Sequence, residues 1–294
     1  MTPIALETAA SYYNASPGTR WFRWLLGAAQ RLSPALAERA ATRLFLTPLP
    51  PKWLQRRHPW AAQWQVEHWD FEATNLTLYS RPAAPHGSLV LLVHGWGGHA
   101  GQMRELAAAV SARGLRPVLL ELPAHGRSRG VTSNLPQFAR AIGYVAARLR
   151  QQGHDVRAVV AHSLAANALA YAAGRGLDVP RLVLLAPPAS PHDYTRLFAH
   201  VFGLSETTRA ALQHRVETRE AVLMRQFEPT SSGPRVGAAT LVVHDREDRI
   251  NPFADGLAFA QSIPQANWLE TSGLGHMRLL KAPAVLDAVV AHVA

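Results

Sequence analysis

The sequence has 294 residues, 48% of them hydrophobic and 17% charged, which fits one large α/β domain or two small ones, with a substantial core. It contains no cysteine, which excludes disulfides, thiolate catalysis and cysteine-based metal sites. The formal net charge is +10, but the arginines are scattered along the chain, so we expect no nucleic-acid partner. No secretory signal and no apolar run of membrane-spanning length is evident, which favours a cytoplasmic protein.

Residues 1–62 differ in pattern from the rest and predict an N-terminal helical extension. Segments 19–32 and 34–46 have the spacing of amphipathic helices. Aromatic residues and arginines occur together in the first of them, where Trp21 and Trp24 are three positions apart. We expect these side chains to form a face packed on the main domain, and a peripheral membrane or lipid contact is the alternative.

Residues 63–294 show the pattern of a mostly parallel sheet. Segments 65–71 and 75–79 alternate polar and apolar side chains, which predicts an antiparallel pair of strands. Continuous apolar runs then alternate with helix-like segments, as in a parallel sheet covered by helices on both faces. The expected buried strands are 88–93, 117–122, 156–161, 181–186 and 240–244, with a last short strand at 267–270. A polar helical stretch at 189–235 interrupts this order and predicts an inserted lid.

The candidate nucleophile is Ser163, at the junction between the 156–161 strand and an alanine-rich helix. Ala161 and Ala165 flank it at two residues on either side, where a tight strand-to-helix turn needs small side chains. The usual form of this turn is Gly-x-Ser-x-Gly, the nucleophile elbow. Alanine leaves the turn feasible but more crowded, because it carries a Cβ atom.

Other polar motifs also follow predicted strands. His94-Gly95-Trp96-Gly97 follows the first buried strand, and the next strand ends in Pro123-x-x-Gly126-x-Ser128. Beyond the insertion, Asp248 stands four residues before Pro252, and Gly275-His276 follows the last strand. The carboxyl edge of a parallel sheet is where sites form, so we expect these motifs to meet there.

On these motifs, the sequence from about residue 64 to the C-terminus resembles the serine-nucleophile α/β-hydrolases, which include esterases and lipases. The resemblance implies the α/β-hydrolase fold and a catalytic triad of Ser163, Asp248 and His276. Asp245 and Glu247 compete with Asp248 for the acid position, but the spacing to Pro252 favours Asp248 and leaves the other two a surface role.

The resemblance also implies an oxyanion hole made by the backbone N–H groups of Trp96 and Leu164, on a loop supported by His94 and Gly95. The implied activity is hydrolysis of a carboxylic ester through an acyl-enzyme, on a small-molecule acyl substrate selected by the lid. A thioesterase, an amidase or a C–C bond hydrolase would use the same groups, and a catalytically idle binding protein is a further alternative. We expect no cofactor and no metal, because no histidine pair has convincing metal-ligand spacing.

Overall fold

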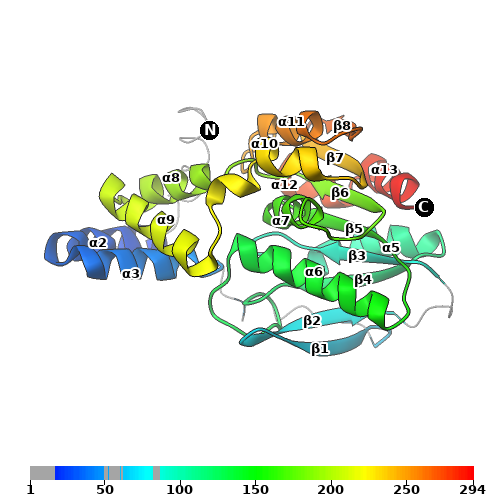
Figure 1. Cartoon of the computed structure of the whole chain (residues 1–294), viewed down its shortest axis with the longest axis horizontal. Coiled ribbons are helices and arrows are strands. Elements are labelled where there is room, and N and C mark those ends of the chain that lie inside the picture. The colour runs from blue at the N-terminus through cyan, green and yellow to red at the C-terminus, as the bar shows by residue number, and fades with distance from the viewer. Residues whose placement is uncertain (1–16, 50–51, 53–59, 61, 82–86) are drawn as a thin grey trace.

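The computed structural model describes residues 17–49, 52, 60, 62–81 and 87–294 (Figure 1). Its centre is an eight-stranded sheet in the order β1-β2-β4-β3-β5-β6-β7-β8. Strand β2 pairs antiparallel with β1 and β4, and the remaining pairs are parallel, which confirms the expected fold class. The strands are β1 Gln65–Phe71, β2 Thr74–Ser80, β3 Leu89–Val93, β4 Arg116–Glu121, β5 Val156–His162, β6 Arg181–Leu185, β7 Ala239–Asp245 and β8 Asn267–Thr271.

Helices cover both faces of the sheet. One face packs against α6, α7 and α11, and the other against α5 and α13. The helices around the sheet are α5 Arg104–Ala112, α6 Leu135–Gln151, α7 Leu164–Ala173, α11 Phe253–Ser262, α12 Gly275–Arg278 and α13 Pro283–Val293, with 3₁₀ turns η1 Ala100–Met103 and η4 Leu279–Lys281. No described helix combines the length and the apolar composition needed to cross a membrane.

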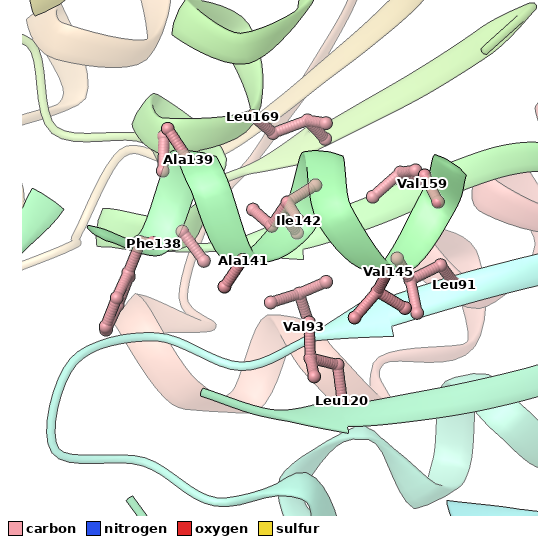
Figure 2. Close-up of a cluster of buried hydrophobic side chains, with 14 of the residues drawn as sticks. Leu91, Val93, Leu120, Phe138, Ala139, Ala141, Ile142, Val145, Val159 and Leu169 are labelled. Atoms are coloured by element: carbon pink, nitrogen blue, oxygen red, sulfur yellow. The ribbon is translucent and has the colours of Figure 1, made fainter. Parts of the chain in front are cut away.

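The alternation of side chains along the buried strands produces the two cores. In β3, Leu91 and Val93 face α6, whereas Leu92 belongs to the cluster on the other face. Figure 2 shows Ile142 and Val145 of α6 lying over β3, the strand that carries Leu91 and Val93. Both faces are apolar, so the central strands read as continuous hydrophobic runs in the sequence.

A group of helices lies beside the sheet (Figure 1, left). Helix α2 packs on α8 and α3 packs on α9, with a shared core that includes Leu26, Ala41, Leu197 and Leu212. The bounds are α2 Pro17–Leu32, α3 Pro34–Phe45, α8 Pro191–Phe202, α9 Glu206–Glu220, η2 Met224–Phe227, α10 Pro229–Ser232 and η3 Gly233–Arg235. The N-terminal helices therefore contact the segment inserted between β6 and β7.

The division into a 1–62 extension and a 63–294 domain with a lid at 189–235 stays a prediction. Parts of the expected extension, at residues 1–16, 50–51, 53–59 and 61, lie outside the described residues.

Candidate active site

Ser163 stands at the sharp turn between β5 and α7. Its backbone has φ 56° and ψ −129°, a combination that residues with a Cβ rarely adopt and that a nucleophile elbow requires. Ala161 and Ala165 are both fully buried around the turn. A Cβ atom added to Gly95 would lie 2.7 Å from the Cβ of Ser163, so glycine is what lets the loop after β3 approach the elbow.

The Asp248 carboxylate and the His276 ring form a buried pair beyond the carboxyl ends of β7 and β8. His276 Nδ1 lies 2.7 Å from Asp248 Oδ2, and Asp248 Oδ1 accepts the N–H groups of Ile250 and Asn251 at 2.8 and 2.9 Å. Burial by itself raises the pKa of Asp248, but hydrogen bonds with His244 and His276 outweigh burial and hold that pKa below its usual range. The ionised carboxylate fixes the proton on Nδ1 and leaves His276 Nε2 as the nitrogen that can accept another.

The Asp245 carboxylate holds the loop that carries His276. The side chain is fully buried, so the expectation of a surface role for Asp245 is wrong. Asp245 Oδ1 accepts the Gly275 N–H at 2.8 Å, while Oδ2 accepts the Thr271 hydroxyl at 2.7 Å and the Leu274 N–H at 3.1 Å. These bonds tie the loop that carries His276 to the end of β7.

The two N–H groups expected to bind an oxyanion have no acceptor within the described part of the chain. These are the backbone N–H groups of Trp96 and Leu164. Leu164 is the first residue of α7, and the N–H groups of a first helical turn have no intrahelical partner. The Gly97 N–H, in contrast, donates to His125 Nε2 at 3.0 Å.

Two buried histidines shape the loop after β3. His94 Nδ1 donates to Gly95 O at 2.7 Å and its Nε2 accepts the Leu122 N–H at 3.2 Å. His125 Nδ1 donates to Pro123 O at 2.8 Å. Burial is the main cause that lowers the pKa of both rings, to about 4 for His125. Both rings are therefore neutral near pH 7 and hold the backbone of the loop.

Ser163 and His276 share no direct hydrogen bond, and His162 connects the two segments that carry them. His162, the residue before Ser163, donates from Nε2 to the backbone oxygen of His276 at 3.1 Å, and the two imidazole rings are 4.5 Å apart. Burial lowers the pKa of His162 to about 3, so His162 serves as a neutral support. Catalytic hydrogen bonds are often long or missing without substrate and tighten when it binds.

Asn251 is a candidate functional residue that the sequence did not reveal. Its Nδ2 donates to Ala186 O at 2.7 Å and to Ser163 Oγ at 3.4 Å. Its Oδ1 accepts the hydroxyl of Tyr194 from α8. An asparagine just before a proline is typical of turns, so nothing in the local pattern distinguished Asn251 from a loop residue.

Both ends of the segment inserted between β6 and β7 are fixed near the elbow. Asn167 of α7 donates from Nδ2 to Pro188 O at 2.8 Å and to Phe227 O at 3.1 Å. The Asp255 carboxylate accepts the Ala189 N–H at 2.9 Å. Burial raises the pKa of Asp255 to about 6, although the Ala189 N–H acts in the opposite direction.

The remaining features of the described residues do not compete with this site. They contain no group of three or more His, Asp or Glu side chains arranged to hold a metal ion. A surface hollow lined by Asp155, Asp178 and Gly237, among others, lies at the amino ends of β5, β6 and β7. This is the opposite edge of the sheet from Ser163, and the hollow shares no residue with the site.

Comparison with known proteins supports the fold. Residues 84–228 match the family model described as serine aminopeptidase, S33. An esterase from Pyrococcus furiosus is similar in structure, with a TM-score of 0.61 at 14% identity over 80% of this chain and 95% of the esterase. The thioesterase domain of a curacin biosynthetic pathway has a TM-score of 0.56 at 20% identity over 78% of this chain and 99% of that domain.

A membrane phospholipase A, a bacterial virulence factor, matches a larger share of the chain. Its TM-score is 0.58 at 15% identity, over 91% of this chain and 98% of the phospholipase. At these identities the likeness establishes a common fold. No curated protein sequence shows significant similarity to the chain.

Proposed function

The chain belongs to the α/β-hydrolase superfamily, and we propose that it is a serine hydrolase that cleaves carboxylic esters through an acyl-enzyme on Ser163. The observation that carries the proposal is the strained elbow at Ser163 together with the 2.7 Å contact between His276 and Asp248. A backbone strained at a positive φ persists only when the surrounding structure enforces it, and such strain is concentrated at active sites.

The residues take their roles from this geometry. Ser163 Oγ attacks the acyl carbonyl while His276 Nε2 takes the hydroxyl proton, and the proton then passes to the leaving alcohol. Asp248 stabilises the imidazolium that forms in between. The N–H groups of Trp96 and Leu164 stabilise the oxyanion, and each such donor contributes on the order of 3 kcal/mol to the lowering of the barrier. Water then releases the acid by the reverse sequence of proton transfers.

The inserted segment selects the acyl group in this proposal. Its helix α8 brings the Tyr194 hydroxyl to Asn251, which contacts Ser163, so the segment borders the nucleophile. We favour an acyl group of modest size. The same catalytic groups would serve a thioester or an amide, and the similar folds include an esterase and a thioesterase.

The test is hydrolysis of a series of p-nitrophenyl esters from acetate to decanoate, compared with acyl thioesters and aminoacyl anilides. Wild-type protein should cleave the esters, with kcat/KM passing through a maximum at one chain length. Ser163→Ala and His276→Ala should abolish this activity while circular dichroism stays unchanged. Faster cleavage of thioesters or anilides would reassign the substrate class, and activity retained in Ser163→Ala would contradict the proposed nucleophile.

A further inference from the structure

The most apolar exposed surface of the described residues lies on the two N-terminal helices. Among the residues that the structure describes, eleven large hydrophobic side chains are exposed, and six of these belong to α2 or α3. Trp21 and Trp24 are 57% and 65% exposed and stack on each other with ring centroids 5.7 Å apart, while Leu32 is 82% exposed. Clustered exposure of this kind marks an interaction surface, because single exposed apolar residues are ordinary and groups of them are not.

Four of these exposed residues form one face of α2. Trp21, Trp24, Leu25 and Leu32 follow the spacing i, i+3, i+4 and i+11, which places them along one side of a helix. We refer to these four residues as the α2 face. We expected the large aromatic side chains of α2 to pack on the main domain. This expectation is wrong, because Trp21 and Trp24 are exposed.

Polar contacts on the other side of α2 fix this orientation. Arg23 donates to the backbone oxygens of His200 and Val201 at the end of α8, at 3.4 and 3.3 Å. Gln30 donates to Gly203 O at 3.1 Å and accepts the Ser205 N–H at 2.7 Å. Helix α2 thus packs Leu26 and these two polar contacts against the protein and leaves its tryptophans on the outward side.

The charge beside the α2 face is positive. Helix α2 has no acidic residue, and its Arg20 and Arg31 are exposed, eleven positions apart and adjacent to the face. No ion pair to either of them is present among the described residues. The one glutamate of α3, Glu38, forms an ion pair with Arg215 of α9, and its side chain is partly buried.

We propose that the α2 face docks on the surface of an anionic phospholipid bilayer. Tryptophan is favoured at the level of lipid headgroups, where its ring is apolar and its N–H is hydrated. An amphipathic helix lying in that plane gains from burying Trp and Leu side chains, and each nearby arginine gains from anionic lipid. The proposal stands on the exposure and charge of α2 and does not depend on ester hydrolysis.

The test is co-sedimentation of the full-length chain with two kinds of vesicle, in a buffer with on the order of 0.1 M salt. One kind is phosphatidylcholine alone, and the other contains 40% phosphatidylglycerol. Wild-type protein should bind the anionic vesicles at least tenfold more tightly than the neutral ones. Trp21→Ala/Trp24→Ala should weaken binding to anionic vesicles at least tenfold, and Arg20→Gln/Arg31→Gln should weaken it several-fold. The matched control is Val66→Ala/Val131→Ala, which removes two exposed apolar side chains elsewhere and should leave binding unchanged.

Several outcomes would overturn the proposal. Wild-type protein that stays in the supernatant with both vesicle types contradicts it, and so does tryptophan-variant binding equal to that of wild type. A wild-type dimer in sedimentation velocity that becomes a monomer in Trp21→Ala/Trp24→Ala, without vesicle binding, would assign the α2 face to a second copy of the chain. The circular dichroism spectrum and thermal midpoint of each variant should match those of wild type, which would show that a loss of binding is not caused by unfolding.

Discussion

The hydroxyl of Tyr194 in α8 hydrogen-bonds to the side-chain oxygen of Asn251, whose amide nitrogen lies 3.4 Å from Ser163 Oγ. One side chain therefore links the inserted helices to the candidate nucleophile. The Asn251 amide occupies a lone pair of the Ser163 hydroxyl and leaves the hydroxyl proton free to point toward His276. Asn251 is by this geometry a positioning residue for Ser163.

Removing the Asn251 side chain should slow catalysis more than removing the Tyr194 hydroxyl. Asn251→Ala should lower kcat about fivefold to tenfold, since one neutral hydrogen bond contributes about 1 kcal/mol. Tyr194→Phe removes only the hydroxyl on the far side of Asn251 and should have the smaller effect. Steady-state kinetics on a soluble short-chain ester, below the thermal midpoint of each variant, measure both. A larger loss in Tyr194→Phe than in Asn251→Ala would contradict the proposed positioning.

Substitution of Asp248 should mainly reduce catalysis, whereas substitution of Asp245 should mainly reduce stability. Asp248→Asn can keep its oxygen on the Ile250 and Asn251 N–H groups, but it then presents an NH₂ group to His276 Nδ1 and reverses the tautomer. A comparable change in a Ser-His-Asp triad costs about 10⁴ in kcat. We expect a loss of this order with little change in the thermal midpoint.

Asp245→Asn should behave in the opposite way. Both Asp245 oxygens accept N–H or O–H donors, so the new NH₂ group must face a donor whichever way it turns. A buried donor left without an acceptor costs about 1–3 kcal/mol. Urea unfolding should show that loss, whereas kcat at low temperature should fall far less than in Asp248→Asn. A small stability change combined with a 10⁴-fold loss of kcat would identify Asp245 as the acid.

The pKa of Asp255 predicts a pH-dependent stability. Burial raises that pKa from 3.8 to about 6, so the folded state binds more protons than the unfolded state between those values. Stability therefore falls as pH rises through this window, by up to about 3 kcal/mol, and the penalty stays constant above it. Asp255→Asn keeps an oxygen for the Ala189 N–H and avoids the buried charge.

The variant should accordingly be more stable than wild type at pH 8, with a smaller advantage at pH 4.5. Urea unfolding at the two pH values measures the difference. Asp178→Asn, which alters a carboxylate that is 80% exposed, serves as the control and should show little pH-dependent difference. An equal difference between Asp255→Asn and wild type at both pH values would contradict the raised pKa.

The sheet was predictable because burial on both faces leaves a simple signal. The strand Leu89–Val93 is entirely apolar, and most positions of the neighbouring strands β4 and β5 are apolar too. This pattern located the strands to within one or two residues. Ser163 could be located from its small neighbours and its place at the end of β5. These signals depend on residues adjacent in sequence.

The parts that escaped prediction depend on contacts distant in sequence. Asn251 contacts Ala186, 65 positions away, and Asp245 binds the loop 30 positions later, and neither pairing has a local pattern. The orientation of α2 was predicted wrongly for a similar reason. Amphipathic spacing identifies a face but does not say whether that face turns inward. Here Arg23 bonds to the end of α8 and Gln30 bonds to Gly203, which follows α8.

The most direct test of the central claim is reaction with a fluorophosphonate probe, read by intact mass and peptide mapping. We predict one adduct on wild-type protein, located on Ser163, and none on Ser163→Ala. His276→Ala, which keeps the serine but removes its base, should react far more slowly. No adduct on folded wild-type protein, or an adduct that persists in Ser163→Ala, would contradict an activated Ser163 and favour a binding protein on a hydrolase fold.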